Sequence, residues 1–345
     1  MISSYYSDKL DSLKDIFATD HVGISEEGLM VDGRLYPIVG DVIVLLSPEE
    51  YPPFLRGDRN LDSARSAGSE TMDREIQFTF GEEWKTFNRV LPEHRVEFDR
   101  YFDLVNLATL KNSRVCDLGC GIGRWNYWLA DRCRELVLVD FSDAIFVARE
   151  NLRTKPQVIY FLGDLTRLPF REGFADFLFC LGVLHHLPDD ALEMTKKLGA
   201  YASRLLIYLY YALDNRPFYF RWLLNGVTVM RRILHTLHHP LARSFLTWLL
   251  TLTLYLPLVG LGHLLERFQR GKLVPLYEGY ANKSILRIRQ DVYDRFFTSI
   301  EQRVTRAQIL ALQSHFDTIT ISDNMPYWHF LCESAARSDH EGTRS

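Results

Sequence analysis

The chain has 345 residues, of which 47% are hydrophobic, and its formal net charge is -4 at pH 7. This length exceeds a typical single domain, so we expect a core with appended pieces. The charge gives no overall attraction to nucleic acid, and we expect no nucleic-acid partner. The five cysteines are odd in number and no pair has C-x-x-C spacing, which argues against a zinc site or a disulfide framework. Residues 1–20 have no apolar signal-peptide region, so a cytoplasmic protein is expected.

The first expected unit, residues 1–75, is a small β module with a linker loop. Residues 28–31 and 35–38 flank the turn Asp32-Gly33, a strong hairpin signal. Residues 41–46 continue as a third strand, and the polar residues 52–71 predict a loop or lid. Further on, residues 93–110 have helical spacing and should pack beside the next strand through side chains that include Val96.

A glycine-rich run at residues 115–125 is the most informative stretch. Val115 and Leu118 give it strand character, while Gly119, Gly121 and Gly123 allow a sharp turn that passes close to a ligand. A helix after the turn would point its free N–H groups at that ligand. A dinucleotide site requires G-x-G-x-x-G, but here the third glycine comes one residue early.

A second strand, residues 135–140, ends in the acid Asp140, about 20 residues after the glycine loop. In a doubly wound sheet, an acidic residue at this place accepts hydrogen bonds from the ribose hydroxyls of a nucleoside. The alternative is that Asp140 caps the following helix.

Two more strands carry motifs at their ends. Residues 158–162 are followed by Gly163-Asp164-Leu165, and residues 177–180 by Leu181-Gly182-Val183-Leu184-His185-His186. Together with Asp117-x-Gly119-x-Gly121-x-Gly123, these motifs resemble those of class I S-adenosylmethionine-dependent methyltransferases. The resemblance implies an α/β fold with a Rossmann-like doubly wound sheet, and S-adenosylmethionine as cofactor.

The resemblance also implies which residues bind the cofactor. Asp164 would meet the adenine amino group, and Leu181 and Gly182 would line the methionine part. The complete expected set is Asp117, Gly119, Cys120, Gly121, Gly123, Asp140, Phe141, Gly163, Asp164, Leu165, Cys180, Leu181 and Gly182.

The run from Tyr36 to Leu46 resembles the zinc-ribbon-like, Trm112-related segment that precedes some bacterial methyltransferases. That segment often has paired cysteines, but here none precedes Cys116, so we expect a β module without metal. Residues 80–84 resemble the Phe-Gly-x-x-Trp signature that follows this module. Trp84 either covers the cofactor or substrate, or is a core aromatic that anchors the loop.

The core is expected at residues 76–213, with its last helix and two strands at 305–334 and a flexible tail at 335–345. Residues 214–304 form a large helical insertion, the kind of segment in which substrate specificity lies. Residues 221–237 are amphipathic, and residues 244–265 contain no Asp, Glu, Lys or Arg, although Pro257 and two glycines should interrupt any helix there.

A stretch of that length could cross a bilayer. A single crossing would place the last strands on the wrong side of the membrane, so a span is excluded if residues 318–332 complete the sheet. Two alternatives remain. The insertion is a helical cap over the site, or residues 221–272 dip into one leaflet beside anionic headgroups at the inner face of the membrane.

Transfer of a sulfonium methyl group needs mainly alignment, although an oxygen or nitrogen acceptor benefits from a general base. His185 and His186 are candidates for that base, or form a wall beside the cofactor. Tyr208, Tyr211 and Asp214 end the fifth strand and are expected to face the acceptor. We expect methylation of a small molecule that is apolar or lipid-linked. The alternatives are a sugar or nucleotide-sugar of surface-glycan synthesis, or a cofactor-binding subunit without activity; the oligomeric state stays open.

Overall fold

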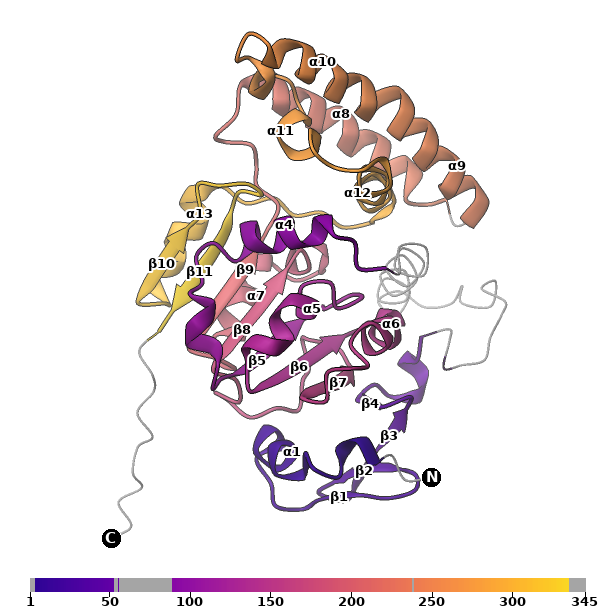
Figure 1. Cartoon of the computed structure of the whole chain (residues 1–345), viewed down its shortest axis with the longest axis vertical. Coiled ribbons are helices and arrows are strands. Elements are labelled where there is room, and N and C mark those ends of the chain that lie inside the picture. Colours follow the sequence, from indigo (N-terminus) through magenta and orange to yellow (C-terminus); the bar gives the residue numbers. More distant parts are fainter. Residues whose placement is uncertain (1–3, 53–54, 56–88, 238, 335–345) are drawn as a thin grey trace.

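The computed structural model describes residues 4–52, 55, 89–237 and 239–334. Trp84 and the tail at 335–345 therefore lie outside the described residues. Figure 1 shows the central sheet with the N-terminal strands at one end of the molecule and the insertion helices at the other.

The described residues form one sheet of eleven strands. In spatial order these are β1 (Val22–Ile24), β2 (Gly28–Val31), β3 (Arg34–Val39), β4 (Val42–Val44), β7 (Val158–Leu162), β6 (Glu135–Asp140), β5 (Arg114–Leu118), β8 (Phe177–Leu181), β9 (Arg204–Tyr208), β11 (His329–Glu333) and β10 (Thr318–Ile321). The strands from β4 to β9 are parallel, whereas β11 is antiparallel to β9. The chain order reverses between β5 and β8, which is where doubly wound sheets bind their ligands.

Helices cover both faces of this sheet, which explains why strands β5 to β8 are buried along their whole length. One face packs against α1 (Leu10–Phe17), α7 (Ala191–Leu198) and α13 (Arg306–Leu310). The other packs against α4 (Glu93–Tyr101), α5 (Asn126–Leu129) and α6 (Ala144–Asn151). The predicted α/β doubly wound fold is confirmed.

The N-terminal strands extend the core sheet. The hairpin predicted around Asp32-Gly33 is present as β2 and β3, and β4 follows it. β4 then pairs in parallel with β7, with Val42 opposite Tyr160. The module is thus hydrogen-bonded to the core as an added sheet edge, a pairing that the sequence did not indicate.

One helix is very short and another is shorter than expected. After the glycine loop there is only the four-residue α5, followed by a 3₁₀ turn at Ala130–Arg132. Helix α4 ends at Tyr101 rather than near residue 110, and Val96, expected to pack inward, is 55% exposed.

The insertion consists of helices. They are α8 (Phe218–Leu234), α9 (Pro240–Leu250), a π-helical turn (Thr251–Tyr255), α10 (Leu256–Glu266), α11 (Tyr277–Tyr280) and α12 (Ile285–Phe297). The expected interruption at Pro257 is wrong, because α9, the π turn and α10 form one helix from Pro240 to Glu266. A proline lacks a backbone N–H, and its ring crowds the preceding turn of a helix. The wider π-helical turn lies just before Pro257 and makes room for its ring.

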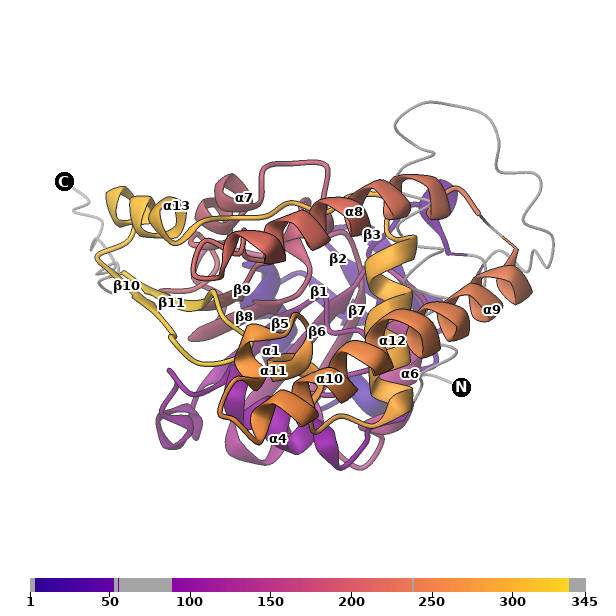
Figure 2. The ribbon, with the colours of Figure 1, turned by 90° about the horizontal axis from the view of Figure 1, so that it is seen from above.

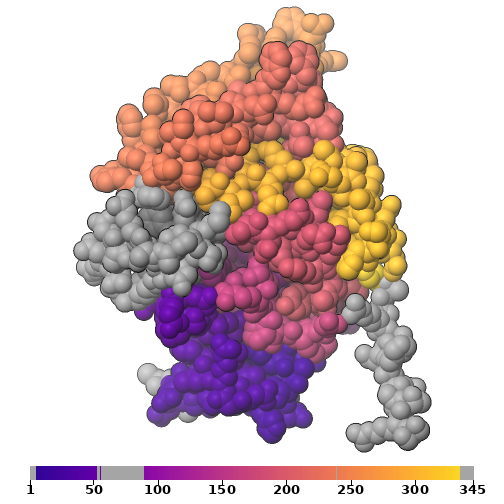
Figure 3. Space-filling view, turned by 180° about the vertical axis from the view of Figure 1, so that it is seen from behind, coloured from indigo at the N-terminus to yellow at the C-terminus, as the bar shows by residue number. Residues whose placement is uncertain are grey.

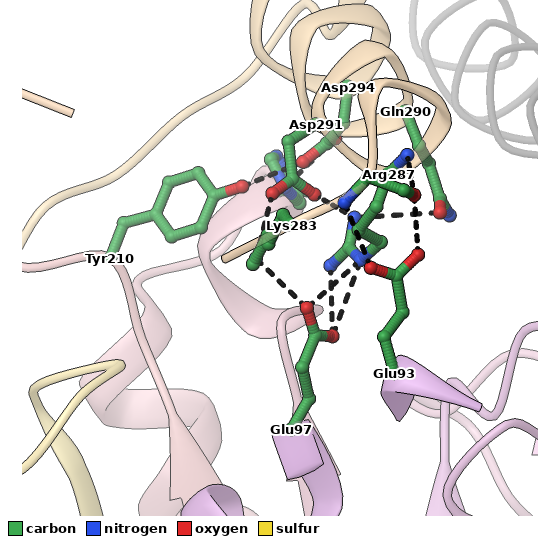
Figure 4. A network of polar contacts seen from close by, with 10 residues as sticks. Glu93, Glu97, Tyr210, Lys283, Arg287, Gln290, Asp291 and Asp294 are labelled. Atoms are coloured by element: carbon green, nitrogen blue, oxygen red, sulfur yellow. Dashed lines mark hydrogen bonds and ion pairs between the residues drawn. The ribbon is translucent and has the colours of Figure 1, made fainter. Parts of the chain in front are cut away.

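A buried charge cluster attaches α12 to the core. Glu97 of α4 accepts hydrogen bonds from Arg287 at 3.2 Å and lies 3.0 Å from Lys283, while Arg287 also pairs with Asp291 (Figure 4). Burial raises the pKa of Glu97, but Arg287 and Lys283 outweigh burial and hold it well below its usual range. Beside it, Glu93 accepts a hydrogen bond from Ser284 at 2.6 Å.

Replacing Glu97 by Gln should destabilise the protein by about 3 kcal/mol, because it leaves the buried charge of Arg287 with only Asp291. The cost should appear as a lower midpoint in denaturant unfolding. Because the folded pKa is lowered, the contribution of Glu97 is complete above its ordinary pKa of about 4.5 and is lost as the pH falls.

The matched control is Asp99→Asn on the same helix, which breaks the exposed ion pair with Arg95. That change should cost about 1 kcal/mol or less. Equal losses in the two variants would show that the buried cluster does not hold the insertion.

Candidate functional site

A cavity of about 600 Å³ lies between the carboxyl ends of the parallel strands and the insertion. Its lower part is formed by the glycine loop and the ends of β6, β7 and β8. Its upper part is formed by residues of α8, the π turn, α11 and α12. One continuous space therefore joins the predicted cofactor site to the insertion.

The glycine loop needs glycine at defined places. Gly119 has a φ of 80°, and an added Cβ would lie 2.4 Å from Cγ2 of Val183. Gly121 and Gly123 also have positive φ, the left-handed region that side chains disfavour. The N–H groups of Gly119 and Cys120 both donate to the carbonyl of Val139, which folds the loop over the end of β6.

Asp140 is buried at the tip of β6 and lines the cavity. Its Oδ2 accepts the N–H of Gly121 at 2.7 Å, and its Oδ1 accepts the N–H and the hydroxyl of Ser142 at 2.9 and 2.7 Å. Burial raises the pKa of Asp140 although these hydrogen bonds oppose it. The capping alternative does not describe this residue, because the first N–H of α6 donates to Ser142 instead.

Asp164 is held by its own turn, and that turn contacts the N-terminal module. Its Oδ1 accepts the N–H and the hydroxyl of Thr166 at 2.8 and 2.7 Å, and its Oδ2 accepts from Arg167 at 2.9 Å. Arg167 also donates to Glu50, which belongs to a 3₁₀ turn (Pro48–Glu50) of the N-terminal module and lines the cavity. Glu50 was missed in the sequence, although the capping box Ser47-x-x-Glu50 marks it as ordered.

Most of the predicted cofactor residues line the cavity: Gly119, Cys120, Gly121, Asp140, Phe141, Gly163, Asp164, Leu165, Leu181 and Gly182. Asp117, Gly123 and Cys180 lie behind it. Asp117 accepts a hydrogen bond from Asn126 at 2.5 Å, and burial raises its pKa well above the usual range. These three residues shape the loop and the strand ends and do not contact the cavity.

The two candidate bases have different surroundings. His185 is fully buried outside the cavity lining and stacks on Tyr210, with ring centroids 3.9 Å apart. Burial lowers the pKa of His185 well below its usual range, and neither ring nitrogen has a hydrogen-bond partner among the described residues. Its expected role as a base is therefore not supported by its position.

His186 does line the cavity. Its Nδ1 lies 2.7 Å from the carbonyl oxygen of Ile300, and its Nε2 lies 3.7 Å from Oδ1 of Asp294. The other oxygen of Asp294 accepts the hydroxyl of Tyr210 at 2.7 Å. Within the described parts of the chain, Oδ1 of Asp294 has no hydrogen-bond partner.

Of the three residues that were expected to face the acceptor, Tyr208 and Tyr211 line the cavity and Asp214 does not. Asp214 instead accepts the N–H of Arg306 at 3.0 Å and the indole N–H of Trp328 at 3.2 Å. It therefore fixes the start of α13 to the last strand, and its expected contact with the acceptor is wrong.

The insertion gives the upper cavity an apolar wall and a charged wall. The apolar wall is Phe220, Leu223, Leu224, Val227 and Leu254. The charged wall, which the sequence analysis missed, includes Arg287, Asp291, Asp294 and Arg295 of α12. Their spacing follows one face of that helix, next to the buried face of Ile288, Val292 and Phe296, so the periodicity of α12 was the available signal.

No group of three or more His, Cys, Asp or Glu side chains in residues 4–52, 89–237 and 239–334 could hold a metal ion.

Comparison with known proteins places residues 115–201 in a protein family described as a methyltransferase domain. The tRNA U34 carboxymethyltransferase of Sulfurimonas denitrificans is 33% identical over 93 residues, which cover 26% of this chain and 31% of that protein. Phosphoethanolamine N-methyltransferase 1 of Caenorhabditis elegans is 31% identical over 94 residues, which cover 27% of this chain and 20% of that protein. The chain spans less than half the length of each of these relatives.

A solved structure of magnesium protoporphyrin IX methyltransferase from Synechocystis PCC 6803 with bound S-adenosylhomocysteine aligns with a TM-score of 0.42 and 16% identity, covering 76% of this chain and 96% of that one. The family match coincides with the part of the sheet that carries the glycine loop, Asp140, Asp164 and His186. Residues 115–201 of this chain are a methyltransferase domain of the class I type, a family whose cofactor is S-adenosylmethionine.

Proposed function

We propose that the protein transfers a methyl group from S-adenosylmethionine to an amphiphilic small molecule bound beneath the insertion. The observation that carries this proposal is that one continuous cavity has the glycine loop at one end and the apolar and charged walls of the insertion at the other. A donor held on the loop and an acceptor held under the helices would meet near β8 and β9.

The lower half of the cavity suits the cofactor. Asp140 would accept hydrogen bonds from the ribose hydroxyls, and Asp164 would accept one from the adenine amino group. Leu181 and Gly182 would form a wall beside the methionine part. The bound cofactor supplies a methyl group already activated by its sulfonium charge, so the protein needs chiefly to align donor and acceptor.

The upper half of the cavity suits a molecule with an apolar part and an anionic or strongly polar part. The apolar wall of α8 and the π turn would contact the first. Arg295 would contact the second: it lines the cavity, its Nε is buried without a hydrogen bond, and it has no ion pair among the described residues. The guanidinium of Arg295 lies 5.3 Å from the ring of Tyr210 and is attracted by the charge of Glu301, but no carboxylate of the described residues is hydrogen-bonded to it. An anionic ligand group would supply such a direct partner.

His186 is the proposed proton acceptor. Its Nδ1 faces a carbonyl oxygen and so carries the proton of the neutral ring, which leaves Nε2 as the basic nitrogen. A proton taken up at Nε2 would face the unpartnered Oδ1 of Asp294, and Tyr210 holds that carboxylate in place. An acceptor whose nucleophile is an oxygen or nitrogen atom would lose its proton to Nε2 of His186.

The relatives named above include enzymes for tRNA and for phosphoethanolamine, so similarity alone does not choose the acceptor. We favour a small molecule because the acceptor half of this cavity is lined by helices of the insertion. Nucleic-acid recognition instead depends on many basic contacts to an extended phosphate backbone.

Incubation with methyl-labelled S-adenosylmethionine and cell extracts tests this function. Label should enter a small amphiphilic molecule, and mass spectrometry should show a gain of one methyl group. Label in nuclease-sensitive material would overturn the acceptor class. Cofactor binding without transfer to any extract would favour the subunit without activity.

Asp140→Ala should weaken S-adenosylhomocysteine binding by about 1–3 kcal/mol in calorimetry, through loss of charge-assisted hydrogen bonds. Asp140→Asn should also weaken it, because an amide nitrogen cannot accept the N–H of Gly121. Asp131→Ala, an exposed acid paired with Lys155, is the control and should bind normally. Unchanged affinity in both Asp140 variants would remove this residue from the site.

His186→Gln should lower turnover about 10²–10⁴-fold while S-adenosylhomocysteine still binds. His185→Phe is the matched control, since it keeps a ring stacked on Tyr210 outside the cavity, and it should retain most of the activity. Near-normal turnover of His186→Gln would mean that positioning alone drives the transfer. Equal losses in both variants would point to a structural role for the pair.

A further inference from the structure

The outer face of the insertion is apolar and exposed to solvent. Trp222 is 71% exposed and Leu241 is 76% exposed, values unusual for such large side chains. Large side chains of the same kind follow one face of each helix. On α8 they are Phe218, Trp222, Val229, Met230 and Ile233, and on the helix from Pro240 to Glu266 they are Leu241, Phe245, Trp248, Leu249, Leu252, Leu261 and Leu264.

The long helix is apolar on both sides. Its inner side packs Leu250, Tyr255 and Val259 in the hydrophobic core of the insertion. The polar side chains Arg243, Thr247 and Thr251 are buried on that inner side as well, while leucine and phenylalanine occupy the exposed positions. A helix on the surface of a soluble protein instead turns polar side chains toward the solvent. Arg243 is not free there, because it donates to the carbonyl of His235 at 3.1 Å and contacts Tyr293 of α12.

The charged side chains of the insertion up to the end of the long helix are almost all basic. Between Asp214 and Glu266 the sequence contains no Asp or Glu, although the whole chain has a net charge of -4. Arg221 and Arg232 are exposed beside the apolar face of α8, and Arg267, Arg270 and Lys272 follow the long helix. An apolar face with basic residues at its edges is complementary to an anionic lipid surface.

The structure also shows how this face is oriented. Helix α12 contacts α8 and α9 and is joined to the core through Glu97, so the exposed faces of α8 and α9 point away from the core. In Figures 1 and 2 these helices lie across the end of the molecule opposite the N-terminal strands, and Figure 3 shows that they form that end from behind.

The helix Pro240–Glu266 is long and apolar enough to cross a membrane by length and composition alone, and 33% of its most apolar window is buried. Crossing is incompatible with the sheet, because β9 before the insertion and β11 after it are hydrogen-bonded neighbours. The helix can lie along a membrane without disturbing that pairing.

We infer that the outer faces of α8 and of the helix Pro240–Glu266 dock on the surface of an anionic lipid bilayer. The apolar side chains enter the outer part of one leaflet, and the arginines and lysine around them contact the headgroups. A second copy of the chain suits this face less well, because it would bring the same basic edges together. This inference does not depend on the proposed methyl transfer.

Flotation with lipid vesicles tests the inference on the full chain. The protein should float with vesicles that contain phosphatidylglycerol, should bind phosphatidylcholine vesicles less, and should lose binding as salt rises. The double variant Arg221→Glu with Arg232→Glu should abolish the preference for anionic vesicles. The matched control is Arg132→Glu with Lys197→Glu. Both residues are exposed and lie outside the insertion, so this variant should bind as the unaltered protein does.

A second variant, Phe245→Ser with Leu252→Ser, separates insertion from simple charge attraction. It should weaken binding to both kinds of vesicle, and its unfolding midpoint should stay close to that of the unaltered protein, since both side chains are exposed. Arg231 and Arg243 are unsuitable for such a test. Both are buried, and Arg231 donates to the carbonyls of Thr298 and Ser299.

Three results would overturn the inference. The first is a monodisperse protein that ignores vesicles of either charge. The second is binding that the control substitutions weaken as much as those on α8. The third is a stable dimer that Phe245→Ser with Leu252→Ser dissociates, which would assign this face to a second copy of the chain.

Discussion

The site depends on the buried contact between Glu97 of α4 and Arg287 of α12. Glu97 belongs to the core and Arg287 to the insertion, and Arg287 also lines the cavity. Removing both charges from water is expensive, and the cost is offset only while Lys283 and Asp291 complete the cluster. Such a contact tolerates little displacement. It therefore fixes the height of α12 above the strand ends, and with it the distance between the two halves of the cavity.

The core was predictable because its signals are local. Strands buried on both faces appear as continuous apolar runs, so β6 and β7 were located to the residue. The glycine loop and Asp140 follow from a fixed spacing of residue types, and that spacing is preserved in the structure. The pairing of β4 with β7 was not predictable, because it joins segments more than a hundred residues apart and leaves no pattern in either.

Side-chain positions near the insertion were harder to predict from residue spacing than those of the core. His185 and His186 are neighbours in the sequence, yet the 3₁₀ turn Leu184–His186 points one into the core and the other into the cavity. Asp214 follows strand β9 closely, as Tyr211 does, but its carboxylate accepts hydrogen bonds from Trp328 and Arg306 and does not line the cavity. Asp294 and Arg295 enter the site only because α12 crosses above it. Their positions result from tertiary packing, which residue spacing does not encode.

Because β4 pairs with β7, the functional unit includes the N-terminal strands. The region recognised by sequence similarity begins at residue 115, but the carboxylate of Glu50 reaches Asp164 through Arg167 from the other side of that boundary. A fragment limited to the recognised region would lack Glu50 and would leave the backbone of β7 as a bare sheet edge, open to pairing with other chains. Grafting this domain onto another protein would thus carry over the glycine loop without the contact from Glu50 that supports Arg167 and Asp164. The segment that resembles an accessory module is, in physical terms, part of the wall of the cavity.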